Sequence, residues 1–155
     1  MIAIRDLFES HLTVSDLDRA MRFYRDVLCL PVAMVVPERR LAFFWIGAPG
    51  KAMLGLWEVG SGPLRMTQHI AFRVDVAAVL GAPHALREAG VMPLNFESKP
   101  ADEPVVLGWM PAVAVYFHDP DGNLLEFLAM LPEPPRPDLG VLPWSSWRAI
   151  ATSAS

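Results

Sequence analysis

The chain has little of several features that mark other classes of protein. It holds one cysteine among 155 residues, so an internal disulfide is impossible and a reducing, cytoplasmic setting is expected. No apolar stretch approaches the roughly 20 residues that a membrane-spanning helix needs. The first ten residues carry Arg5, Asp6 and Glu9, where a signal peptide would be apolar. We therefore expect a cytoplasmic protein without a membrane partner.

Charge is also scarce. Charged residues make up 19% of the chain and the net charge is -4. No stripe of basic residues is present, which argues against binding to nucleic acid. The hydrophobic fraction of 53% and the length are enough to bury a core. We predict a single domain over residues 1–130. Residues 131–155 form a C-terminal tail that contains proline and tryptophan and lies over the surface.

The sequence repeats itself. Two pairs of stretches are similar: "HLTVSDL" with "HIAFRVDV", and "GAPGKAMLGLWEV" with "HDPDGNLLEFLAM" (11–17 with 69–76, and 47–59 with 118–130). Internal repetition indicates that one structural unit occurs twice. The repeat predicts two modules, at about 8–59 and about 67–130.

Each module is predicted to follow the order strand, helix and three strands, which gives an α+β fold. Alternating or continuous apolar runs bounded by turn residues predict the strands. The predicted strands are 10–14, 32–36, 41–46, 52–59, 69–75, 94–98, 112–118 and 124–130. Ser15 and Asp16 are good caps for the first helix, and the second runs from about Val76 to Ala89 and stops at Gly90.

Glu126 stands in the apolar strand "LLEFLAM". A buried carboxylate is costly unless it has a partner or binds a metal. The repeat places His11 and His69 at equivalent positions, so packing around a pseudo-twofold axis would bring both imidazoles to Glu126. Two imidazoles and one carboxylate on one side of a metal leave coordination positions open for a substrate. We predict that these three residues bind a divalent metal: iron, manganese, nickel or zinc.

The stretches "HLTVSDLDRAMRFYRDVLCLPV", "TQHIAFRVD" and "VYFHDPDGNLLEF" resemble the vicinal oxygen chelate superfamily of glyoxalases, bleomycin-resistance proteins and dioxygenases. The resemblance covers nearly all of residues 8–130. It implies paired βαβββ modules that form an open, barrel-like mixed sheet with helices outside and a divalent metal inside. It also implies a homodimer, often with the pocket completed between chains, and it assigns His11, His69 and Glu126 as the metal ligands.

The sequence also departs from relatives within this superfamily. Glyoxalase I resembles this chain but has a fourth ligand, a glutamate, at the position that Gly55 occupies here. Glu58 lies three residues further along, on the opposite face of a strand. No general base stands out, and Glu58 and Tyr116 are the candidates for a catalytic group. Extradiol catechol dioxygenases share the three-ligand triad.

Fosfomycin-resistance thiol transferases share the triad as well, together with a threonine two residues after the first histidine, as Thr13 is here. They need a cationic pocket for a phosphonate. Here Lys99 is balanced by Asp102 and Glu103. The charge balance in this loop therefore weakens the interpretation as a fosfomycin-resistance thiol transferase, although the triad favours it.

The pocket is predicted to be lined by Thr13, Trp45, Trp57 and Trp109. Such a lining suits a small, partly apolar substrate that presents oxygen atoms to the metal. The predicted function is that of a metal-dependent lyase, isomerase or dioxygenase acting by Lewis-acid catalysis. Two alternatives stay open. One is a non-catalytic protein of the bleomycin-resistance type that sequesters a drug or other ligand, and the other is a glutathione-linked lyase or transferase.

Overall fold

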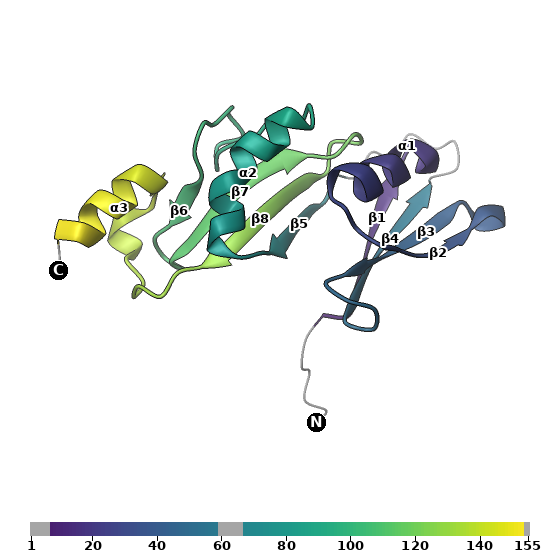
Figure 1. Cartoon of the computed structure of the whole chain (residues 1–155), viewed down its shortest axis with the longest axis horizontal. Coiled ribbons are helices and arrows are strands. Elements are labelled where there is room, and N and C mark those ends of the chain that lie inside the picture. Colours follow the sequence, from purple (N-terminus) through teal and green to yellow (C-terminus); the bar gives the residue numbers. More distant parts are fainter. Residues whose placement is uncertain (1–6, 59–66, 154–155) are drawn as a thin grey trace, which may run out of the picture. The chain divides into compact units, whose positions relative to one another are not determined.

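The computed structural model describes residues 7–58 and 67–153 of the chain (Figure 1). The chain divides into two compact units. The first unit holds the residues up to 68 together with Asp119–Gly122, and the second holds His69–His118 and the residues from Asn123 onward. Within the described ranges, no helix is both long and apolar enough to cross a membrane.

The first unit is a four-stranded mixed sheet with a helix on one face. Its elements are β1 Glu9–Val14, α1 Leu17–Arg22, a π-helical turn Phe23–Val27, β2 Val32–Val36, a 3-10 turn Pro37–Arg39, β3 Leu41–Ile46 and β4 Ala52–Glu58. The strand order is β1-β4-β3-β2, with β1 parallel to β4 and the other pairs antiparallel. Asp16 caps α1 by accepting a hydrogen bond from the Arg19 N–H at 2.9 Å, which confirms the predicted cap.

Alternation along the strands separates the two faces of this sheet. Leu12 and Val14 of β1 are buried on the face that α1 covers. Tyr24, in the π-helical turn, packs on Phe44 of β3 with ring centroids 6.0 Å apart. Burial of such side chains stabilises the unit by about 1.5–3 kcal/mol each. The β1 residues that alternate with Leu12 and Val14, such as His11, consequently point to the other face.

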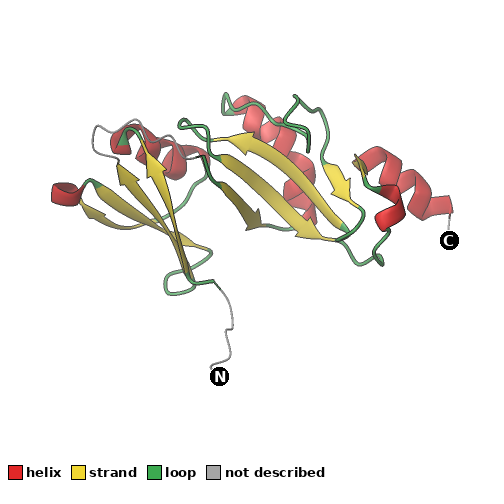
Figure 2. Cartoon of the chain, turned by 180° about the vertical axis from the view of Figure 1, so that it is seen from behind, coloured by secondary structure: helices red, strands yellow, loops and turns green. Residues whose placement is uncertain are grey.

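The second unit is a five-stranded sheet. Its elements are β5 His69–Arg73, α2 Val76–Glu88, β6 Val105–Leu107, β7 Ala112–His118, β8 Leu124–Met130, a 3-10 turn Pro137–Leu139, β9 Val141–Pro143 and α3 Trp144–Ser153. The strand order is β5-β8-β7-β6-β9, with β5 parallel to β8. Helix α2 packs on one face of this sheet, and the view from behind shows the strands in front of it (Figure 2).

The predicted α+β fold of two βαβββ modules is confirmed, and neither described sheet closes on itself. One predicted strand, 94–98, is wrong. Leu94 makes only isolated bridges, to Pro100 and Tyr116. The Asn95 side chain bends the chain back by accepting hydrogen bonds from the backbone N–H groups of the next turn, so it competes with a strand ladder. The position of the missing strand is taken by β6.

The C-terminal tail carries a strand and a helix that the sequence pattern did not predict. Strand β9 pairs with β6, and α3 buries Trp147. The Glu103 carboxylate accepts hydrogen bonds from the backbone N–H of Ser145 at 2.9 Å and from its hydroxyl at 2.8 Å, which fixes the start of α3. The prolines interrupt regular structure only before the 3-10 turn, and a strand of three residues is too short to show periodicity.

Candidate metal site

His69 and Glu126 meet on the second sheet, on neighbouring strands. The register pairs His69 with Leu124 and Ala71 with Glu126, so both side chains lie on the same face. His69 Nε2 lies 3.0 Å from Glu126 Oε2. The imidazole is 49% exposed while the carboxylate side chain is 5% exposed. The structure thus brings two of the three predicted metal ligands into contact.

Tyr116 is the third member of this group. It lies opposite Glu126 on β7, so the two side chains are on the same face of the sheet. Its ring centroid is 6.1 Å from that of His69. Burial raises the pKa of Tyr116, and the charge of Glu126 raises it further. Tyr116 therefore keeps its proton at neutral pH and acts as a hydrogen-bond donor rather than as a base.

One oxygen of the Glu126 carboxylate has no hydrogen-bond partner within the described part of the chain. Burial raises the pKa of Glu126, while the charge of His69 and the hydrogen bonds from Tyr116 and His69 lower it in part. Oε2 faces His69, but Oε1 is buried and has no hydrogen-bond partner among the residues that the structure describes. A buried oxygen left in this state is costly. A cation beside it would remove that cost.

His11 lies in the first unit, on the sheet face that α1 does not cover. The indole N–H of Trp57 donates a hydrogen bond to His11 Nδ1, and His11 Nε2 lies 2.6 Å from Glu9 Oε1. The ring of Phe43 meets the imidazole edge-on with centroids 5.7 Å apart. Both ring nitrogens are therefore engaged. A neutral imidazole that binds a metal through one nitrogen carries its proton on the other, so metal binding at either nitrogen would require His11 to give up the hydrogen bond from Trp57.

Gly55 explains how His11 fits against the sheet. The two residues are register partners on β1 and β4, and a Cβ atom built on Gly55 would lie 2.7 Å from His11 Nδ1. The absence of a side chain lets the imidazole lie directly over β4. A glutamate at this position, as in glyoxalase I, would force the His11 ring to move.

The structure places the predicted pocket residues in two groups. Thr13, Trp45 and Trp57 share the His11 face of the first sheet, since their register partners alternate with the buried residues. Trp109 lies in the turn between β6 and β7, where it is 59% exposed. This turn is at the opposite end of β7 from Tyr116, about 13 Å along the strand.

Among the described residues, no three histidine, cysteine, aspartate or glutamate side chains form a metal-binding group. His69 and Glu126 belong to the second unit and His11 to the first. The meeting of all three at one ion therefore stays a prediction.

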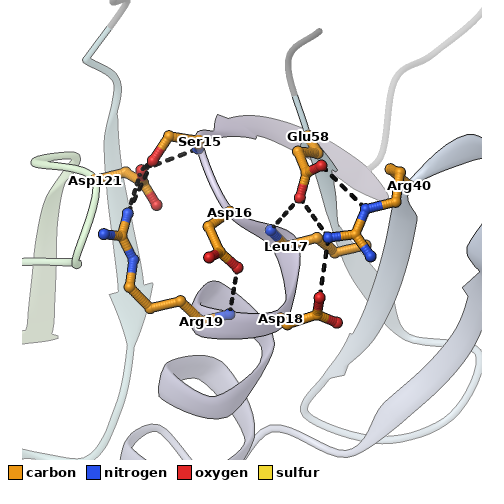
Figure 3. Close-up of polar contacts among 8 residues, drawn as sticks. All are labelled: Ser15, Asp16, Leu17, Asp18, Arg19, Arg40, Glu58 and Asp121. Atoms are coloured by element: carbon orange, nitrogen blue, oxygen red, sulfur yellow. Dashed lines mark hydrogen bonds and ion pairs between the residues drawn. The ribbon is translucent and has the colours of Figure 1, made fainter. Parts of the chain in front are cut away.

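Glu58 faces the start of α1 (Figure 3), and alternation along β4 places it on the other face of the sheet from His11. One carboxylate oxygen accepts hydrogen bonds from the backbone N–H of Leu17 and from Arg40 Nη2, both at 2.6 Å, and the other accepts from Arg40 Nε at 3.0 Å. The guanidinium of Arg40, followed by the Leu17 N–H, lowers the pKa of Glu58. Glu58 therefore caps the start of α1, and it lies on the sheet face opposite to Gly55.

Substitution Glu58→Gln should lower the free energy of unfolding by about 1 kcal/mol at pH 7. The wild-type contribution exists while the carboxylate is ionised, so it is complete above the ordinary pKa of 4.5 and is lost as the pH falls through the lowered value. Urea denaturation at pH 7 and pH 3.5 should show the difference shrinking at the lower pH. The exposed Glu38→Gln is the matched control, and a difference that grew on acidification would contradict this account.

The turn Asp119–Gly122 forms hydrogen bonds with other residues of the first unit (Figure 3). The sequence pattern gave no reason to expect these contacts. Asp121 Oδ1 accepts hydrogen bonds from the Ser15 N–H at 2.9 Å, from Arg19 Nη2 at 2.8 Å and from the Ser15 hydroxyl. Asp119 Oδ2 accepts a hydrogen bond from the buried Tyr24 hydroxyl at 2.9 Å. These two carboxylates therefore have structural partners.

Comparison with known proteins identifies relatives along both units. The model of the Glyoxalase/Bleomycin resistance protein/Dioxygenase superfamily matches residues 6–127. The metallothiol transferase FosB of Shouchella clausii (strain KSM-K16) is 29% identical over 120 residues, 76% of each chain. An integron cassette protein, HFX_CASS4, from the Halifax Harbour sewage outfall is 32% identical, with a TM-score of 0.69 over 82% of this chain and 100% of that one. Lactoylglutathione lyase from Agrobacterium tumefaciens shares the fold, with 24% identity and a TM-score of 0.62 over 82% of this chain and 95% of that one.

Proposed function

Because the chain belongs to the Glyoxalase/Bleomycin resistance protein/Dioxygenase superfamily, we propose that it is a divalent-metal-dependent enzyme of the glyoxalase/dioxygenase type. The proposed ligands are His11, His69 and Glu126, and the substrate is a small, partly apolar molecule that carries oxygen atoms. One observation carries the proposal: Glu126 Oε1 is buried and has no hydrogen-bond partner in residues 7–58 and 67–153, while the other oxygen of the same carboxylate lies 3.0 Å from an imidazole.

The residues fit such an ion. A carboxylate and neutral imidazoles suit zinc, iron, manganese and nickel. When bound, the ion supplies Lewis acidity, which polarises substrate oxygens and stabilises negative charge as it develops on them. We propose that His11 completes the site, either from the same chain or from the second subunit of a homodimer.

The surrounding residues prepare this pair for its role. Tyr116 lies opposite Glu126 with its ring beside His69, and so limits the positions that both side chains can take, as outer partners of metal ligands commonly do. Trp57 packs beside the His11 ring, with ring centroids 5.9 Å apart. These residues position the proposed ligands and do not react themselves.

A metal-dependent thiol transferase is the second candidate. It is favoured by the relative of that name and by Thr13, which shares the His11 face. A phosphonate substrate has less support, because Lys99 Nζ pairs with Glu97 at 2.6 Å. Asp102 pairs with Arg87, and Glu103 caps α3, so these two acids do not balance Lys99 as the sequence suggested. Sequestration of a ligand without turnover is the non-catalytic alternative.

Activity assays after metal exchange test the proposal. The protein would be stripped with a chelator, reloaded anaerobically with iron(II), manganese, nickel or zinc, and screened with catechols, hemithioacetals, and epoxides plus a thiol. We expect turnover of one class that disappears on chelation and in His69→Ala. Binding of a ligand without turnover, at an affinity that metal removal leaves unchanged, would contradict the enzymatic proposal and support sequestration.

A further inference from the structure

A row of rings leads away from the proposed metal ligands in the second unit. The ring centroid of Tyr116 is 6.1 Å from that of His69 on one side and 6.2 Å from that of Phe96 on the other. Phe96 meets Tyr116 edge-on, at 72°. Tyr116 is 4% exposed, whereas Phe96 is 56% exposed. The row therefore ends in one aromatic ring that is open to solvent.

Hydrogen bonds fix the backbone on both sides of Phe96. Leu94 and Tyr116 exchange both of their backbone hydrogen bonds, at 2.7 and 3.0 Å. Asn95 Oδ1 accepts from the N–H groups of Glu97 at 2.9 Å and Lys99 at 3.0 Å, and the Asn95 N–H donates to the Lys99 carbonyl at 2.8 Å. An ordered turn next to β7 thus carries Phe96, so the exposed ring starts from a fixed backbone position.

The side chains packed around Tyr116 are apolar and buried. Tyr116 belongs to a buried cluster with Leu94, Val105 and Ala114, against which Leu124 packs. Val105, Ala114 and Tyr116 share one face by register. The nearest charges in the turn, Glu97 and Lys99, neutralise each other in an ion pair. A flat hydrocarbon group placed here would gain from covering the ring and would meet no uncompensated charge in this turn.

We propose that Phe96 forms an apolar subsite that receives a ring or other flat hydrocarbon group of the ligand whose oxygen atoms lie at His69 and Glu126. This inference rests on the proposed metal-dependent function. Single exposed phenylalanines are common on protein surfaces. Phe96 differs from them because hydrogen bonds hold the turn that carries it, and because its ring contacts Tyr116, the register partner of Glu126. It determines specificity and does not take part in the chemistry.

Two hydroxamates with identical metal-binding atoms test the subsite. Acetohydroxamate carries a methyl group and benzohydroxamate a phenyl group, so their affinity ratio measures what the hydrocarbon part contributes. Titration calorimetry of the zinc-loaded full chain should show benzohydroxamate binding about tenfold more tightly. Phe96→Ala should abolish this preference and leave the affinity for acetohydroxamate unchanged, whereas Phe96→Tyr should keep the preference. Met92→Ala is the control, because Met92 is 55% exposed on the same connection between α2 and β6.

Zinc content is measured on each sample before titration, which separates the two proposals. A chain that takes up no zinc contradicts the proposed function, and the subsite falls with it. A zinc-loaded chain that keeps its benzohydroxamate preference in Phe96→Ala, or that has none as wild type, overturns the subsite alone. Equal weakening of both probes in Phe96→Ala also overturns it, because the residue would then support the pocket without selecting the hydrocarbon group.

Discussion

Replacing Glu126 by glutamine should lower the affinity for a divalent metal by more than about 100-fold, which exceeds the cost of losing an outer partner of a ligand. Glutamine keeps the size of the side chain and can still accept a hydrogen bond from Tyr116, but it lacks the charge that balances a cation. His69→Ala should have an effect of the same order, because it removes the imidazole that lies beside the carboxylate. Competition against a chromophoric chelator measures both affinities.

His84→Ala is the matched control for this experiment. His84 also lies close to a carboxylate, 3.3 Å from Glu88, but both side chains are exposed on α2. Its loss should leave metal affinity unchanged. Unaltered affinity in Glu126→Gln, or an equal loss in His84→Ala, would contradict a site at β5 and β8. His11→Ala adds a separate test of the proposed third ligand, and an unchanged affinity there would remove His11 from the site.

Gly108→Ala should lower the free energy of unfolding by about 3 kcal/mol. Gly108 is the point where the C-terminal segment crosses the end of β6. Its N–H donates to the Gly140 carbonyl at 2.8 Å, and its carbonyl accepts from the Arg136 N–H at 2.7 Å. A Cβ atom here would overlap the Arg136 carbonyl oxygen and lie 2.9 Å from that of Gly140. Both obstacles are backbone atoms, so the segment itself must move.

Gly81→Ala is the control for Gly108→Ala. Gly81 lies inside α2, and a Cβ atom there would meet nothing within 4 Å. Alanine should therefore raise the free energy of unfolding, by about 0.5–1 kcal/mol. Urea denaturation measures both changes. Hydrogen exchange should also show faster exchange in β6 and β9 of Gly108→Ala, and unchanged protection of these strands would contradict the role assigned to the tail.

The sequence predicted those parts of the fold that depend on local pattern. Apolar alternation located β1, β3 and β8, and the acid before the first helix, Asp16, is its cap. The repeat brought Gly55 and Glu126 into correspondence, and each lies on the last strand of its βαβββ module. Burial of Glu126 followed from the apolar residues around it, and the structure confirms this burial.

The parts that escaped prediction depend on contacts between distant residues. Asn95 is compatible with a strand and also with a turn in which its side chain bonds the backbone. Which of these two conformations forms depends on the pairing of Leu94 with Tyr116. The ring contact between Phe96 and Tyr116 has no sign in the sequence for the same reason, since the two residues are 20 positions apart. Strand β9 forms because it pairs with β6. The sequence of the tail alone gives no sign of this pairing.

The most direct test of the proposed metal site is a crystal structure of the metal-loaded protein with anomalous diffraction at the absorption edge of the metal. We predict one ion per chain, bound at about 2.0–2.2 Å by His69 and Glu126 and by the imidazole of His11 from the same or a second copy. An ion bound elsewhere, with Glu126 Oε1 still buried and without a ligand, would contradict the account.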